Sequence, residues 1–139
     1  LFNEHTSVEV FKLSGIEALQ RSLEKILKGE ETNIDKNWKS GKLRLLKIRS
    51  CSASIVQSKK LKHPKKNRTL LFAWKDNYFI KIVGLIDEVD NRMENLILCL
   101  NNNLISRKKL RKQIQKIQGC LECICKIIRH FICGLQLKT

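Results

Sequence analysis

Six cysteines are the residues of this sequence best suited to chemistry, either as disulfides or as metal ligands. An even number of cysteines in a chain of 139 residues is typical of secreted proteins with disulfide bonds. Neighbouring cysteines of the 120–125 group point to different sides of a helix, so they need at least two partner segments. We expect bridges from Cys51 and Cys99 to this group, with Cys133 in the remaining bond. The six cysteines are Cys51, Cys99, Cys120, Cys123, Cys125 and Cys133.

Two other roles of the cysteines stay open at this point. Cys120-x-x-Cys123 has the spacing of zinc ligands, but a structural zinc site needs four convergent ligands. Cys125, His130 and Cys133 spread around the same predicted helix, so we predict no metal site. A thioredoxin-type redox role would need a strand before the first cysteine, and the pattern predicts none. Reduced, buried thiols are the alternative to disulfides.

The sequence lacks the residue arrangements that enzymes commonly use for catalysis. Its histidines are His5 near the start, His63 in a charged segment and His130 on the last predicted helix. No serine, cysteine or acid stands at a spacing that suggests a catalytic triad, and no glycine-rich phosphate loop occurs. We therefore expect no enzyme activity and no cofactor. We expect a solvated acidic patch to pair with the basic excess, formed by Asp87, Glu88, Asp90 and Glu94.

Basic residues dominate the charge of the chain. Lys and Arg number 28 against 13 Asp and Glu, giving a formal net charge of +15, and such a charge attracts anionic partners. Two clusters are predicted to bind polyanions. The first lies within residues 59–68 and comprises Lys59, Lys60, Lys62, Lys65, Lys66 and Arg68. The second begins the last predicted helix and comprises Arg107, Lys108, Lys109, Arg111 and Lys112, followed by Lys116.

The position of the second cluster favours a role in binding. Positive charge at the start of a helix is unfavourable for the helix dipole, so its presence there indicates use. Nucleic acid is a less favoured polyanion, because neither cluster contains aromatic residues that could stack on bases. The aromatic residues gather instead on the third predicted helix and suit a core: Phe72, Trp74, Tyr78 and Phe79. A third basic group comprises Lys39, Lys42, Arg44, Lys47 and Arg49.

The apolar periodicity predicts an all-α protein, a disulfide-stapled bundle of four to five helices forming one domain over residues 1–139. Asn33 or Asp35 is expected to cap the second helix, and Pro64 to separate the second helix from the third, which we expect to be the longest. The predicted helices span residues 7–28, 33–59, 69–100 and 106–135. The last carries a heptad-like seam of Leu110, Ile114, Ile117, Leu121, Ile124, Ile128, Phe131 and Leu135.

Several features predict a secreted, extracellular protein. The chain begins at Leu1 and not at Met, so we expect a processed mature chain or an excised fragment. Asn67-Arg68-Thr69 is a glycosylation sequon, which predicts glycosylation at Asn67. No run of about 18 uncharged apolar residues occurs, so no membrane span is predicted. The hydrophobic content of 42% is too high for a disordered tail.

The order of these features resembles a known family. It comprises Phe11 with the Leu19-Gln20-x-x-Leu23 run, a Trp38 segment leading to Cys51, the Ala73-Trp74-Lys75-x-x-Tyr78 helix with Cys99 at its end, and a closing helix with cysteines. This order resembles the helical C-terminal domain of the aegyptin-type salivary proteins of blood-feeding flies. It is also similar in outline to albicin-like salivary complement inhibitors.

The resemblance covers most of the chain, although the acidic Gly/Glu-rich N-terminal half of the aegyptin type is absent from this sequence. It implies a secreted, non-enzymatic inhibitor of host haemostasis or innate immunity, acting on the coagulation contact pathway, platelets or complement. The partners would be host proteins or sulfated and phosphorylated polyanions such as heparin-like glycans.

Two alternative functions stay open. An intracellular nucleic-acid-binding protein would use the same basic clusters and would keep six free thiols. A helical cytokine-like ligand would also have long helices, but that class of bundle has long crossover connections.

Overall fold

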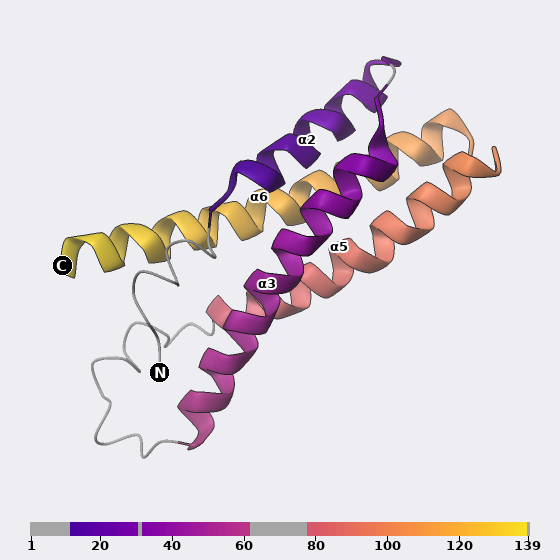
Figure 1. The fold of residues 1–139 in the computed structure, drawn as a ribbon. Helices are drawn as coiled ribbons and strands as arrows, with labels where there is room; N and C mark the ends of the chain where they lie inside the picture. The colour runs from indigo at the N-terminus through magenta and orange to yellow at the C-terminus, as the bar shows by residue number, and fades with distance from the viewer. Residues whose placement is uncertain (1–11, 31, 62–77, 139) are drawn as a thin grey trace.

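The protein is a bundle of antiparallel α-helices (Figure 1). A computed structural model describes residues 12–30, 32–61 and 78–138, and these residues form four helices and no strand. The all-α prediction is therefore confirmed for the described part of the chain. The helices are α2 (Ser14–Leu27), α3 (Ile34–Leu61), α5 (Tyr78–Asn101) and α6 (Arg107–Lys138).

The chain reverses direction after α2 and after α5 by the same device. After α2, Gly29 adopts a φ of 77° and the Glu30 amide donates to the Lys25 carbonyl at 2.8 Å. After α5, Asn103 adopts a φ of 52° and the Leu104 amide donates to the Cys99 carbonyl at 3.0 Å. Both are helix ends of the Schellman type, in which glycine or asparagine takes the left-handed conformation.

Side-chain caps fix where two of the helices begin. The Lys36 amide donates to Asn33 Oδ1 at 3.1 Å, so Asn33 caps α3 as predicted. The Lys109 amide donates to Ser106 Oγ at 3.3 Å, which caps α6. The first helix was predicted to begin near residue 7, which lies outside the described residues. Its predicted extent is wrong, because Lys12 and Leu13 are not helical and α2 begins at Ser14 with no side-chain cap.

The other helix boundaries differ from the predicted ones by a few residues. Helices α3, α5 and α6 end two, one and three residues later than predicted. The predicted start of the third helix, Thr69, lies outside the described residues. The longest described helix is α6 with 32 residues, against 24 for α5, and the prediction that the third helix is the longest stays a prediction, because its predicted first nine residues lie outside the described ranges.

Contacts between neighbouring helices show the direction of each one. Contacts that come later along one helix come earlier along its neighbour, so neighbours are antiparallel and the described bundle runs up-down-up-down (Figure 1). The contacting side chains are Asn37 with Ser22, Lys42 with Glu94, Arg49 with Asp87, Arg92 with Gln113, Cys120 with Glu88, Gln118 with Glu24, and Arg129 with Glu17.

One hydrophobic core joins the four helices. The predicted seam of α6 is confirmed where side chains are described, since Ile114, Ile117, Leu121, Ile124 and Ile128 are fully buried. The side chains of residues 131–138 lie outside the described part. The other helices contribute Ile16, Leu19, Leu23, Trp38, Leu45, Ile48, Phe79, Ile82, Ile86, Val89, Met93 and Leu96.

Gly41 of α3 packs against Leu19 of α2. A Cβ at this position would lie 3.3 Å from a methyl carbon of Leu19, which is tighter than ordinary van der Waals contact. Glycine in a helix interior generally lowers helix stability relative to alanine. Helix α3 is nevertheless continuous through Gly41, and the missing side chain lets the helices pack closely.

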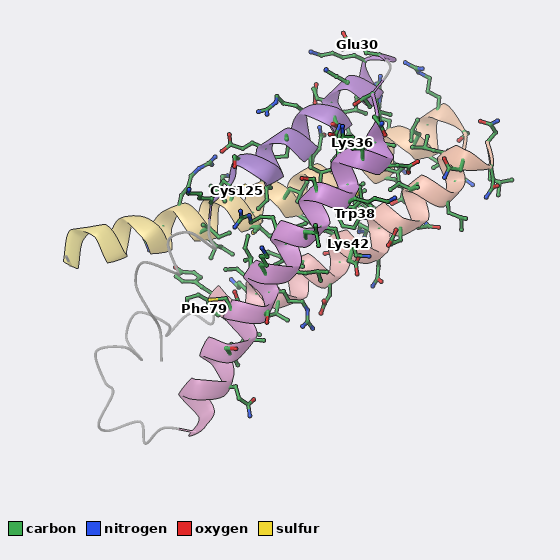
Figure 2. The ribbon with its side chains drawn as sticks, in the orientation of Figure 1. Glu30, Lys36, Trp38, Lys42, Phe79 and Cys125 are labelled. Atoms are coloured by element: carbon green, nitrogen blue, oxygen red, sulfur yellow. The ribbon has the colours of Figure 1, made fainter. Side chains whose placement is uncertain are left out.

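The aromatic residues are divided between the core and its edge. Phe79 is buried, as predicted, and Figure 2 shows it near the start of α5. The Tyr78 ring meets the His130 ring edge-on, with centroids 5.8 Å apart. Phe72 and Trp74 lie outside the described residues. None of the helices in the described ranges is both long and apolar enough to cross a membrane.

Candidate polyanion-binding surface

The first three turns of α6 carry an exposed group of cations, which we name the α6 basic surface. Lys108, Lys112 and Lys116 follow one another at intervals of four residues, so they form a line along one side of the helix. All six members of the surface are exposed. The members are Arg107, Lys108, Lys109, Arg111, Lys112 and Lys116.

Among the described residues, the α6 basic surface forms no ion pair, and its link to an acid is a longer-range Coulomb interaction of Lys116 with Glu88. Residues 95–121 contain no Asp or Glu. In the described part of the chain, no carboxylate lies within ion-pairing distance of any of the six cations. Their charges therefore remain available to an external anion.

The third basic group behaves differently, because α5 supplies acids to part of it. Lys42 Nζ lies 2.7 Å from Glu94 Oε1 and 3.3 Å from Asp90 Oδ1. Arg49 donates to both carboxylate oxygens of Asp87, at 2.6 and 3.2 Å. These bonds raise the pKa of Lys42, mainly through Glu94, and that of Arg49 through Asp87. We name this arrangement the α3–α5 ion-paired face.

Trp38 is the buried residue that contacts both Glu94 and Lys42 of the α3–α5 ion-paired face. Its ring is buried, its Nε1 lies 3.4 Å from Glu94 Oε2, and Lys42 Nζ lies 5.8 Å from the ring centroid. Figure 2 shows Trp38 and Lys42 on neighbouring turns of α3. The predicted pairing of the acidic patch with the basic excess is therefore confirmed. Two other members of the group, Lys39 and Lys47, are exposed.

The first predicted basic cluster is largely outside the described residues. Lys59 and Lys60 lie in the last turn of α3, but their side chains are not described. The polyanion-binding prediction for this cluster and the glycosylation prediction for Asn67 stay predictions. The residues outside the described ranges are Lys62, Lys65, Lys66, Asn67 and Arg68.

The described cysteines are free thiols, and no two of them lie at disulfide distance. Cys125 faces the core, Cys123 faces solvent and Cys120 faces α5, which confirms that the 120–125 group points to different sides of α6. Cys125 is labelled on α6 in Figure 2. The described thiols are Cys51, Cys99, Cys120, Cys123 and Cys125, and the Cys133 side chain lies outside the described part.

The antiparallel pairing of α5 and α6 keeps Cys99 away from the 120–125 group. Cys120 Sγ lies 3.3 Å from Glu88 Oε2. Cys99 lies eleven residues after Glu88 on the same helix, which is about 16 Å along the helix axis. Disulfides need Cα atoms within about 7 Å. The fold therefore does not bring together the residues of the expected Cys99 bridge.

The environment of the thiols suppresses their reactivity. Burial and the neighbouring Glu88 carboxylate raise the pKa of Cys120 to about 11. Burial also raises the pKa of Cys51 and Cys125. Because the thiolate is the form that reacts and binds metals, these three cysteines are poor nucleophiles at neutral pH. Within the described residues, no group of three or more His, Cys, Asp or Glu is placed to hold a metal ion.

A shallow groove of about 570 Å³ lies between α2 and α6, and sequence patterns did not predict it. Its charged walls already pair with each other, as Arg129 lies 3.8 Å from Glu17 and Gln118 donates to Glu24 at 2.9 Å. Small-molecule sites are mostly apolar with a few convergent polar groups, so this groove lacks their character. Its lining residues are Glu17, Gln20, Arg21, Glu24, Gln118, Glu122 and Arg129.

Exposed leucines are a second feature that sequence patterns did not identify. Leu98 and Leu104, on either side of the α5–α6 turn, are 59% and 74% exposed. Leu43 and Leu46, on the outer side of α3, are 65% and 41% exposed. The signal in the sequence was their position outside the apolar stripes of the predicted helices.

We compared the chain with models of known protein families, with curated protein sequences and with solved structures, and none of these comparisons gave a match. The resemblance to aegyptin-type and albicin-like salivary proteins stays a prediction. The function is therefore argued from the residues of this chain.

Proposed function

We propose that this protein is a secreted, non-enzymatic binding protein that recognises polyanions through the α6 basic surface. The observation that carries the proposal is the exposure of six cations on three helical turns with no acid in ion-pairing distance among the described residues. Sulfated glycans and host proteins that carry dense negative charge have the complementary chemistry. The resemblance to salivary inhibitors narrows the proposed role to inhibition of host haemostasis or innate immunity.

The α6 basic surface costs the free protein stability, which supports a role outside folding. Like charges four residues apart on a helix repel each other by a few tenths of a kcal/mol per pair, and Lys108, Lys112 and Lys116 have this spacing. Cations in the first turn also oppose the helix dipole. A bound polyanion would neutralise both repulsions and release its counterions, so binding is expected to weaken steeply as salt rises.

Heparin chromatography at increasing salt tests the proposal with charge-matched variants. The wild-type protein should elute well above physiological salt, and Lys108→Gln/Lys112→Gln should elute earlier, with its salt slope lowered by about two. The control, Lys39→Gln/Lys47→Gln, removes the same charge from two exposed positions of α3 and should elute close to wild type. Equal shifts for both variants would contradict the proposal, because they would indicate attraction to net charge alone.

We also propose that the secreted protein contains disulfide bonds. Counting thiols in the denatured protein, with and without reductant, tests that part directly. Fewer than six thiols without reductant supports an oxidised, secreted protein. Six thiols in freshly purified natural protein contradicts secretion, whatever the heparin result.

A second candidate is an intracellular nucleic-acid-binding protein that uses the same α6 basic surface. The observation that favours it is the free state of the five described thiols, since intracellular proteins keep thiols reduced. The thiol count separates the two candidates. The cytokine-like alternative is not favoured, because cytokine bundles run up-up-down-down with two long crossovers, whereas the described helices run up-down-up-down.

A further inference from the structure

We propose that the α5–α6 end of the bundle docks on the surface of an anionic lipid bilayer, with Leu98 and Leu104 entering the interface between headgroups and acyl chains. The cations of the α6 basic surface would contact the headgroups. The inference rests on the proposed function, because it assigns a partner to the same cations.

The geometry of the turn brings the two leucines together. The Leu104 amide donates to the Cys99 carbonyl and the Asn103 amide to the Leu100 carbonyl, at 3.0 and 3.4 Å. In a helix end of this type, the residue after the left-handed position folds back beside the last turn of the helix. Leu104 therefore lies next to the turn that carries Leu98, yet both remain more than half exposed.

The surroundings of these leucines are basic. Leu104 is followed by Arg107 and Lys108, at the start of a surface with six cations and no acid among residues 95–121. The adjacent α2–α3 loop contains two acids in sequence, Glu30 and Glu31, and Figure 2 shows Glu30 at the end of the bundle. The Arg107 side chain reaches this loop, since its Nη2 lies 3.7 Å from the position that a Cβ on Gly29 would occupy. The α6 basic surface therefore extends to the α2–α3 loop at this end of the bundle.

A bilayer accounts for both components of this surface, whereas a soluble polyanion accounts for one. Interfacial segments combine cations, which attract anionic headgroups, with apolar side chains that enter the acyl boundary. A glycan in solution has no apolar phase and would leave Leu98 and Leu104 in water. The leucines of α3 are a weaker candidate, because Leu46 borders the α3–α5 ion-paired face, whose carboxylates would be repelled by an anionic membrane.

Vesicle co-sedimentation tests the inference. Wild-type protein should bind vesicles of phosphatidylcholine mixed with phosphatidylserine and should not bind vesicles of phosphatidylcholine alone. Leu98→Ser/Leu104→Ser should lower binding to the anionic vesicles at least about tenfold, since each leucine loses much of its transfer free energy. Its elution from heparin should be unchanged, because no charge is altered.

A matched variant controls for the loss of exposed apolar surface. Leu43→Ser/Leu46→Ser removes two exposed leucines from α3 and should bind anionic vesicles like wild type. Unchanged vesicle binding by Leu98→Ser/Leu104→Ser, or equal losses in both leucine variants, would overturn the inference and leave the proposed function standing. The inference would also be overturned if the wild-type protein binds heparin but does not bind anionic vesicles. Failure of the wild-type protein to bind heparin would instead contradict the proposed function.

Discussion

Two regions of the molecule carry the same kind of charge in different surroundings. On the α3–α5 ion-paired face, Lys42 and Arg49 each hold a carboxylate of α5 within 2.7 Å. On the α6 basic surface, Lys108 and Lys112 have no carboxylate within ion-pairing distance in the described part of the chain. Both regions are runs of Lys and Arg at similar density in the sequence.

The difference lies in the neighbouring helix. The α5 helix places Asp87, Asp90 and Glu94 toward α3, and it gives the α6 side one carboxylate, Glu88. Hydrogen bonds from Cys120 and Arg92 lower the pKa of that carboxyl, with a smaller Coulomb contribution from Lys116 of the α6 basic surface. Exposed ion pairs stabilise a protein by at most about 1 kcal/mol. The comparison therefore indicates that the paired cations contribute to the fold, and it supports the proposed role of the unpaired cations in recognition.

The largest expected effect comes from removing the anchor of the α3–α5 ion-paired face. Trp38→Ala should lower the free energy of unfolding by about 3–5 kcal/mol, because it leaves a cavity beneath that face. Urea unfolding followed by circular dichroism measures the change. At temperatures where the variant is folded, its elution from heparin should match wild type.

Trp38→Phe is the control, since it keeps an aromatic ring and removes the N–H that faces Glu94. Trp38→Phe should lower the free energy of unfolding much less than Trp38→Ala does. If Trp38→Ala unfolds no more easily than Trp38→Phe, the face does not depend on the buried ring, and the assignment of this region to the fold fails.

Local patterns in the sequence predicted the helices well where local physics decides them. The seam from Ile114 to Ile128 follows from helical periodicity. Asn33 at the start of α3 follows from capping preference. The start of α2 was placed too early, because apolar residues before Ser14 continued the helical spacing without forming a helix at Lys12 and Leu13.

Tertiary contacts decided the rest, and one sequence does not contain them. Lys42 and Lys112 look alike in the sequence, and what separates them is a carboxylate 52 residues away from the first. The separation of Cys99 from Cys120 depends on how α5 and α6 slide against each other, which their periodicity does not fix. The exposure of Leu104 likewise depends on a turn that directs this apolar residue toward solvent.

A single carboxylate added to α6 should give the α6 basic surface an ion pair like those of the α3–α5 ion-paired face. Gln115 is exposed, four residues after Arg111 and three after Lys112, so Gln115→Glu can pair with either. We expect the free energy of unfolding to rise by about 0.3–0.5 kcal/mol and the salt slope of heparin binding to fall by about one. Gln57→Glu, an exposed position on α3, makes the same change in net charge. Equal weakening of heparin binding by both variants would remove the distinction between the two regions.

The smallest expected effect concerns acid pH. The hydrogen bond from Lys42, followed by its Coulomb attraction and a hydrogen bond from Trp38, lowers the pKa of Glu94 below its ordinary value of 4.5. A carboxyl whose pKa is lower in the folded state stabilises the fold above its unfolded pKa, and this contribution disappears as the pH falls through the folded pKa. The effect should be a few tenths of a kcal/mol, because the Glu94 side chain is 54% exposed and screened by solvent.

Thermal unfolding between pH 6 and pH 3 in wild type and Lys42→Met isolates this contribution, and added salt should reduce it. The loss of stability with acid should be smaller in the variant, because Glu94 then has no cation to lower its pKa. Lys112→Met should leave the acid dependence of wild type unchanged, since Lys112 has no carboxylate in ion-pairing distance among the described residues. If Lys112→Met alters it as much as Lys42→Met, carboxylates couple to both regions alike, and the unpaired state of the α6 basic surface does not hold in solution.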